Sequence, residues 1–263
     1  LGGIIPCCSR AAQWSGRTHQ MRWKAITDIR LYIKAAPEQK LAAWKNGPPD
    51  SKEFNHLAFR FARKLRELGF QTPQYDHIYL YLTPELTHGE AAFLEGFANR
   101  KGPRAMACNL KVGVSPDQWA LLNELERTEF MVHLISNALH FLAVEDSLDV
   151  SLVDQVKDLM LKHGSDLEIV QMRKKKGSLE VAVSYTIEED SKLYVSWHNT
   201  KTGQSGRKLV MHVNIARDVP SLVRKVSISK EGITLIPGDS ARDKAQRIKY
   251  IGLMEFPIHI PIQ

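Results

Sequence analysis

The sequence predicts an α+β protein, with N-terminal helices packed on a small mixed sheet and a C-terminal antiparallel β-sheet of about six or seven short strands. Three observations indicate this fold class. A long apolar stretch with helical periodicity covers residues 115–144, and two amphipathic helical patterns precede and follow it. After Asp166, short β-rich runs alternate with turn clusters. The composition, 43% hydrophobic and 25% charged over 263 residues, is that of an ordinary globular chain.

We expect three parts along the chain. Residues 1–20 show no periodicity and are expected to be a disordered leader or the product of a wrongly assigned start. Residues 21–164 form an α/β half, and residues 165–263 form an antiparallel β half that is either separate from the first or continuous with it. Three cysteines make no disulfide framework, and no apolar run reaches the length of a membrane span. We therefore expect a soluble, cytoplasmic protein with no cofactor and no membrane contact.

The N-terminal half begins with a strand over residues 23–33, which is rich in β-branched and aromatic residues. A helix follows from Asp50, its expected N-cap, to Gly69, a good left-handed terminator. Residues 77–83 alternate Ile and Leu with His and Tyr, which predicts a strand whose tyrosine-bearing face either contacts a partner or packs under a helix. Residues 89–99 are expected to form a short helix, and residues 105–114 a strand.

The central element is predicted to be one long, mostly buried helix over residues 115–144. Ser115 can cap it, and Pro116 suits the first helical position. An apolar stripe recurs at spacings of four and three and is expected to face a core, through Leu121, Leu125, Thr128, Val132, Ile135, Leu139 and Leu142.

A narrow polar line on this helix is the best candidate for a ligand or metal site. It consists of Glu126, Glu129, His133, Asn137 and His140, which share one helical face. A carboxylate and imidazoles at this spacing could bind a divalent metal, yet the spacing matches neither the HExxH nor the di-iron pattern. The alternative is that the line is the solvated edge of the helix, with Glu129 and His133 as a surface pair.

Two groups of cations are candidates for binding a partner or phosphates: Lys52, Arg60, Arg63 and Lys64 on the helix of residues 50–69, and Arg173, Lys174, Lys175 and Lys176 near a predicted hairpin tip. The alternatives are a solvated helix face and a charged tip that serves solubility. The net charge of +7 is spread along the chain, so no region is basic enough to indicate nucleic-acid binding.

The remaining elements are a helix over residues 150–163, stopped by Gly164, and a series of β runs. Strands are expected at residues 167–172, 179–187, 193–198, 209–215, 223–229, 233–236 and 248–258. Simple hairpin registry places His198 opposite Lys208 and His212 near Tyr194.

Two functional classes remain. The chain contains no P-loop, GxGxxG, GxSxG, HExxH, paired CxxC or EF-hand pattern, which lowers the expectation of an enzyme. The first class, which we favour, is a non-enzymatic binding protein acting on another protein, for instance an inhibitor or immunity-type protein of a bacterial toxin or enzyme. The second is a metal-dependent or nucleic-acid-processing enzyme that uses Glu129, His133 and His140 together with the basic clusters.

Overall fold

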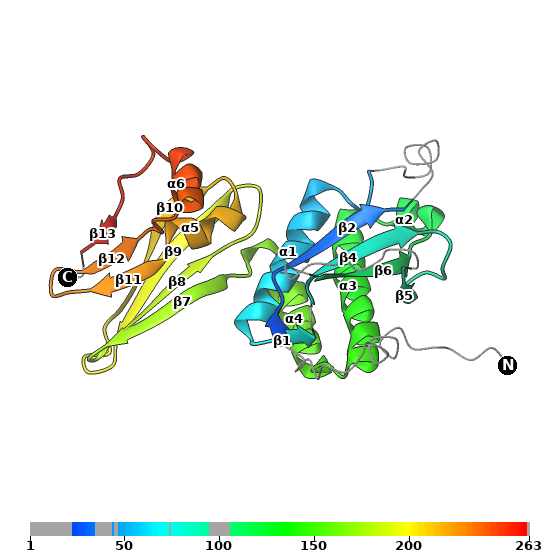
Figure 1. Ribbon diagram of the computed structural model, residues 1–263, viewed down its shortest axis with the longest axis horizontal. Helices are drawn as coiled ribbons and strands as arrows, with labels where there is room; N and C mark the ends of the chain where they lie inside the picture. Colours follow the sequence, from blue (N-terminus) through cyan, green and yellow to red (C-terminus); the bar gives the residue numbers. More distant parts are fainter. Residues whose placement is uncertain (1–22, 35–43, 45–46, 74, 95–105, 262–263) are drawn as a thin grey trace, which may run out of the picture. The chain divides into compact units, whose positions relative to one another are not determined.

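The computed structural model describes residues 23–34, 44, 47–73, 75–94 and 106–261 (Figure 1). The chain forms two compact units, Leu1–Gly164 and Ser165–Gln263. The leader expected at residues 1–20 lies outside the described residues. As predicted, the chain mixes helices with a mixed sheet in the first unit and an antiparallel sheet in the second.

The first unit is built on a four-stranded sheet with the order β2-β4-β6-β5. Three of its strands are parallel, and β5 is antiparallel to β6. Their bounds are β2 (Asp28–Ile33), β4 (Tyr75–Thr83), β5 (Ala91–Phe93) and β6 (Met106–Gly113). A separate antiparallel pair joins β1 (Trp23–Ala25) to β3 (Gln71–Pro73).

Two predictions for this half are wrong. The strand predicted over residues 23–33 is two strands in different sheets, because the chain leaves β1 after Ala25 and starts β2 at Asp28. The helix predicted over residues 89–99 contains the strand β5, whose backbone pairs with Leu110–Val112 of β6. Residues 95–99 lie outside the described part of the chain.

Helix α1 (Lys52–Glu67) packs on β2 and is close to its predicted bounds. Its cap is Ser51, whose hydroxyl accepts from the Phe54 N–H, whereas the predicted cap Asp50 accepts from the Ile33 N–H of β2 at 3.1 Å. The chain leaves the helix through Gly69, whose φ of +90° only glycine adopts readily.

The predicted single helix over residues 115–144 is two helices, α2 (Pro116–Leu121) and α3 (Glu124–Asp146). Asn123 interrupts the run, because its side chain accepts from the Glu126 N–H while the Glu126 carboxylate accepts from the Asn123 N–H, a complete capping box. Leu121 is 84% exposed and Leu125 68% exposed, so this part of the predicted stripe does not face the core. The stripe is buried from Val132 onward, through Ile135, Leu139 and Leu142.

Helix α4 (Val150–His163) packs against α1 and α3, and Gly164 ends it as predicted. The helices α1 and α3 cover the sheet face that carries Ile29, Leu31, Ile78, Leu80 and Leu110, all of them buried. No helix in the described ranges is both long enough and apolar enough to cross a membrane.

The second unit contains two antiparallel sheets with the orders β10-β9-β8-β7 and β11-β12-β13. Their bounds are β7 (Ile169–Lys176), β8 (Leu179–Tyr185), β9 (Ser191–Asn199), β10 (Ser205–Val213), β11 (Lys225–Ile228), β12 (Ile233–Ile236) and β13 (Ile258–Ile260). Short helices complete it: η2 (Gly164–Asp166), η3 (Ala216–Asp218), α5 (Val219–Leu222) and α6 (Ala241–Ile248). The predicted number of strands is therefore divided between two sheets.

Three details of this half differ from the prediction. The last extended run, predicted at residues 248–258, is instead the end of α6 and a turn, and only Ile258–Ile260 is strand. The four cations Arg173–Lys176 lie inside β7, so the turn is confined to the residues after them. His198 pairs with Ser205 and His212 with Lys192, because the loop between β9 and β10 is shorter than expected and β10 contains a bulge.

Candidate functional site

The polar line predicted on the central helix lies on α3, but its members have different surroundings. Glu126 belongs to the capping box at the start of the helix. His140 contacts α4, with its Nε2 3.2 Å from the Asp154 Oδ1. Glu129, His133 and Asn137 are exposed. Within the described residues no group of three or more His, Cys, Asp or Glu side chains converges as metal ligands would. The line is thus not assembled into one cluster.

The cations of α1 do not form one solvated face. Arg60 is only 6% exposed and donates to the main-chain oxygen of Gly164 at 3.0 Å. Lys64 is 9% exposed and pairs with Glu67, one turn later on the same helix, at 3.0 Å. The Arg63 guanidinium lies 5.9 Å from the ring centre of Phe59, and Lys52 is exposed at the first turn. Arg60 and Lys64, two of the predicted phosphate-binding cations, are therefore largely buried and held by contacts within the chain.

The cations of β7 alternate between the two faces of its sheet. Lys174 and Lys176 donate to main-chain oxygens of β11, at 2.6 Å for Val226 and 2.7 Å for Ile228. Lys175, on the other face, forms an ion pair with Glu180 at 2.6 Å. Arg173 is exposed and makes no hydrogen bond or ion pair with another described residue. Strand β7 thus directs Lys174 and Lys176 toward β11, and it directs Arg173 and Lys175 to the outer face of the sheet.

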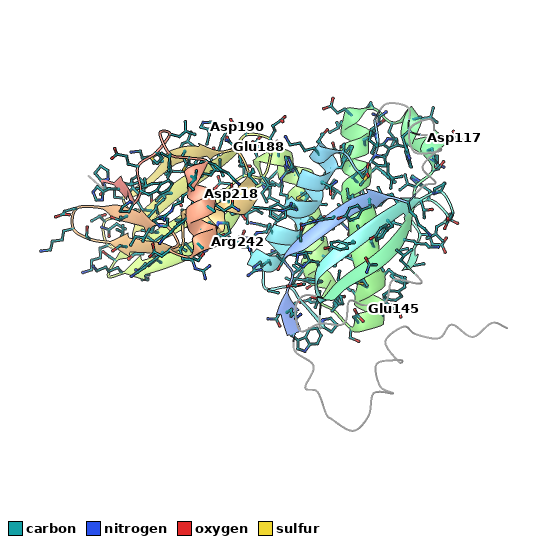
Figure 2. All side chains as sticks on the ribbon, turned by 45° about the horizontal axis from the view of Figure 1, so that its top comes forward. Asp117, Glu145, Glu188, Asp190, Asp218 and Arg242 are labelled. Carbon is teal, nitrogen blue, oxygen red and sulfur yellow. The ribbon has the colours of Figure 1, made fainter. Side chains whose placement is uncertain are left out.

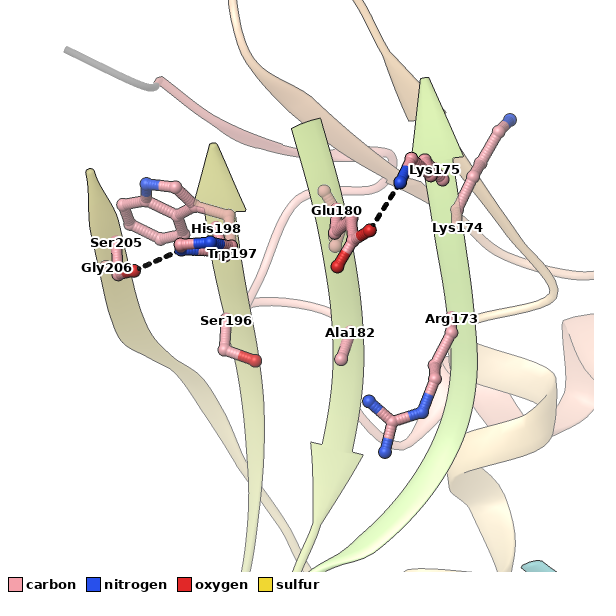
Figure 3. A pocket seen from close by; sticks show the side chains of 11 residues that line it. Arg173, Lys174, Lys175, Glu180, Ala182, Ser196, Trp197, His198, Ser205 and Gly206 are labelled. Atoms are coloured by element: carbon pink, nitrogen blue, oxygen red, sulfur yellow. Dashed lines mark hydrogen bonds and ion pairs between the residues drawn. The ribbon is translucent and has the colours of Figure 1, made fainter. Parts of the chain in front are cut away.

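That outer face of the four-stranded sheet contains an open hollow of about 650 Å³, shown in Figure 3. Side chains from all four strands line it, including Arg173, Lys175, Glu180, Ala182, Ser196, His198 and Ser205. The imidazole Nδ1 of His198 lies 2.7 Å from the Ser205 hydroxyl oxygen. The hydrogen bond from Lys175 holds the pKa of Glu180 below its usual value.

The first unit carries a group of aromatic side chains on the sheet face opposite α1 and α3. The register places Arg30, Tyr79 and Asn109 in one row across the strands, and Tyr32, Tyr81 and Lys111 in the next. We call these six residues the tyrosine face. In Figure 1 and in Figure 2 the sheet lies in front of α3, so the face is turned away from that helix. All six residues are partly exposed, and no described helix covers them.

The ring of Tyr32 contacts the rings of both other tyrosines. Tyr32 stacks on Tyr81, with ring centres 5.4 Å apart, and meets Tyr79 edge to face at 5.7 Å. The Arg30 guanidinium lies 5.9 Å from the ring centre of Tyr79. Burial, and then the neighbouring Tyr32 and Tyr79, raise the pKa of Tyr81, so its hydroxyl stays protonated at neutral pH. Mutual packing of this kind restricts the rings and gives the face a defined shape.

Each cation on this surface lies near a carboxylate. Arg30 Nε is 2.6 Å from Asp28, which is only 2% exposed. Glu85, in the loop after β4, is 3.1 Å from Lys111 Nζ and 3.7 Å from Lys34 Nζ. The hydrogen bond from Lys111 is the largest cause of the lowered pKa of Glu85. The tyrosine face therefore combines aromatic area with nearly balanced charge.

The alternation over residues 77–83 predicts the tyrosines of β4 on one strand face, but it does not predict the complete tyrosine face. Tyr32 and Arg30 lie on β2, about 50 residues earlier in the chain, and only the parallel register with β4 brings them beside Tyr79 and Tyr81. The alternation over residues 28–33 carried the same signal as that over residues 77–83, with Ile and Leu on one face and charged or aromatic residues on the other. The two patterns indicate two strands with one polar and aromatic face each, and the parallel pairing of β2 with β4 joins those faces.

Comparison with known proteins gives no relative from which a function could be carried over. The chain matches no protein-family model, and neither the curated proteins nor the solved structures contain a significant match.

Proposed function

We propose that the protein is a non-enzymatic binding protein that recognises another protein through the tyrosine face. The observation that carries the proposal is the two-row register that gathers Tyr32, Tyr79, Tyr81 and Arg30 on a sheet face without a described helix over it. Tyr and Arg are enriched among the residues that dominate protein–protein binding energies. Binding then inhibits the partner, as an immunity-type protein inhibits a bacterial toxin or enzyme.

The geometry of the rings supports this proposal. A tyrosine has only two side-chain torsions to fix on binding, and rings that already pack on one another lose less freedom still. Tyr32 touches both other rings in the unbound chain. A partner would therefore meet an ordered surface, on which each ring offers an apolar body and a hydroxyl that donates and accepts hydrogen bonds.

The charges favour a protein over a nucleic acid as the partner. Nucleic-acid binding depends on cations that neutralise phosphates. Here Arg30 is paired with Asp28, and Lys111 with Glu85. The stacking of Tyr32 on Tyr81 also occupies ring faces on which bases would otherwise stack. We therefore expect a partner whose contact surface is close to neutral.

The test is an affinity capture from the native host at moderate salt, with the eluate analysed for protein, nucleic acid and metal. Three baits are compared: the wild type, a Tyr32→Ala/Tyr79→Ala variant and a Leu121→Ala/Leu125→Ala control, which removes two exposed apolar side chains elsewhere on the same unit. Circular dichroism checks that each bait is folded.

The proposal predicts one stoichiometric protein, retained by the wild type and the leucine control and lost from the tyrosine variant. Equal retention by the tyrosine variant would exclude this face as the binding surface. Recovery of nucleic acid in a salt-sensitive manner, or of a transition metal, would instead support the enzyme class.

A further inference from the structure

The hollow on the four-stranded sheet of the second unit results from the register in which the strands pair. The register aligns Arg173, Ala182 and Ser196 in one cross-strand row, and Lys175, Glu180, His198 and Ser205 in the adjacent row. Adjacent strands lie about 4.8 Å apart. Two small side chains at neighbouring positions therefore leave a depression about 10 Å wide, with long polar side chains around it. We call this depression the trough.

Some of the cationic side chains around the trough already form ion pairs with carboxylates, and one does not. Arg207, on the far side of Ser196, pairs with Glu168 and lies 3.9 Å from the ring centre of Tyr194. Lys175 is bound to Glu180. Arg173 has no hydrogen-bond or ion-pair partner among the described residues, and Figure 3 shows its guanidinium extending from β7 toward the strand that carries Ala182. Its planar group is thus available at the trough.

The charge at the trough is positive. Arg173 and Lys175 contribute two positive charges and Glu180 one negative charge, so the three side chains sum to one net positive charge. The ion pair with Lys175 lowers the pKa of Glu180, so this carboxylate is already engaged by a cation. The hydroxyl of Ser196, on the strand beyond Ala182, adds a neutral donor to the lining of the trough. Guanidinium groups bind carboxylates and phosphates through two parallel hydrogen bonds.

We propose that the trough is a binding site for a single oxyanion, a phosphate or carboxylate, held by Arg173 over the floor formed by Ala182 and Ser196. The site is independent of the tyrosine face and does not rest on the proposed function. Its volume falls in the range of pockets that hold small molecules, and its open shape also admits a side chain of a peptide. The same chemistry therefore fits a free anion or a phosphorylated residue.

The experiment is an NMR titration of the full chain with two probes, inorganic phosphate and a tripeptide containing phosphoserine, followed by the amide signals of Ala182 and Ser196. Arg173→Gln removes the charged donor. Ala182→Leu fills the floor without changing the charge. Lys208→Gln is the matched control, because Lys208 is an exposed cation on the same sheet that does not line the trough.

The proposal predicts saturable shifts with at least one probe in the wild type and in Lys208→Gln. It also predicts affinity weakened by about tenfold or more in Arg173→Gln, the usual size of a lost charged hydrogen bond, and a loss of binding in Ala182→Leu. If the phosphoserine tripeptide binds more tightly than inorganic phosphate, the source of the anion is a phosphorylated protein. If the two probes bind with equal affinity, the source is the free ion. Absence of saturable shifts in the wild type, or equal affinity in all variants, would overturn the proposal.

Discussion

The ammonium group of Lys174 on β7 donates a hydrogen bond to the main-chain oxygen of Val226 on β11, with a distance of 2.6 Å. Two residues further along both strands, Lys176 makes the same contact with Ile228 at 2.7 Å. The two-residue period of β-strands keeps the two contacts in step. Val226 and Ile228 point these carbonyl groups away from β12, so the two lysines supply the donors that β12 does not. Strand β11 is the edge of its sheet, and the lysine contacts therefore also hinder its pairing with another chain.

From this contact we predict that Lys174→Met combined with Lys176→Met lowers the free energy of unfolding. Each substitution leaves a partly buried carbonyl oxygen without its donor, and we expect about 1–3 kcal/mol in total. Urea denaturation measures the effect. Lys175→Met is the control, because its ion pair with Glu180 is exposed, and it should change the stability little. An equal loss in the control would show that the carbonyl contacts are not the cause.

A second prediction concerns the close approach of two chain segments at the end of the parallel sheet. A Cβ atom at Gly113 would lie 1.8 Å from the main-chain oxygen of Thr87, so no side chain fits there. We expect Gly113→Ala to destabilise the first unit by about 3 kcal/mol or more, because backbone atoms must move. Thermal denaturation checks this. A melting temperature equal to that of the wild type would mean that the loop after β4 can move away from residue 113 without lowering the stability.

The third prediction is a pH dependence caused by His88. Its ring stacks on Phe130 with centres 4.4 Å apart and accepts from the Ser115 N–H at 3.3 Å. Burial lowers the pKa of His88 below its usual 6.5. The unfolded chain therefore binds the proton more readily than the folded chain, so this contribution to stability is present above pH 6.5 and is lost as the pH falls through the lowered pKa.

Unfolding midpoints in urea at pH 7.5 and pH 5 measure this effect. The difference between the two midpoints should be smaller in His88→Gln than in the wild type, since that variant carries no imidazole at position 88. A difference of equal size in both proteins would show that other groups cause the dependence.

Helices are predicted correctly from the sequence where the apolar stripe, the cap and the terminator all indicate the same bounds. The helices α1 and α4 have apolar stripes that end at Gly69 and Gly164, and both were predicted within a few residues. The prediction is wrong where two sequence signals in the same segment indicate different structures. The apolar period continues across residues 115–144, but Asn123 and Glu126 also form a capping box, and this second start signal divides the helix.

The surfaces were harder to predict than the elements because they depend on register. The low β-propensity of Arg173–Lys176 predicts a hairpin tip rather than a strand. Within β7, however, Lys174, Lys175 and Lys176 each find a partner across the sheet edge or on the neighbouring strand. The tyrosine face and the trough both join residues from separate strands, and a chain pattern alone does not give which strands are neighbours.

Site-specific photo-crosslinking tests whether the tyrosine face contacts a protein partner. The photoreactive amino acid p-benzoylphenylalanine, which resembles tyrosine in shape, replaces Tyr79 in one protein and Leu161 in a control. Leu161 lies on α4 and is 40% exposed, so it offers an accessible position away from this face. After irradiation in extracts of the native host, adducts are identified by mass spectrometry. If the tyrosine face binds a protein, position 79 gives one protein adduct and position 161 gives none. The same adduct from both positions, or no protein adduct from position 79, would contradict this proposal.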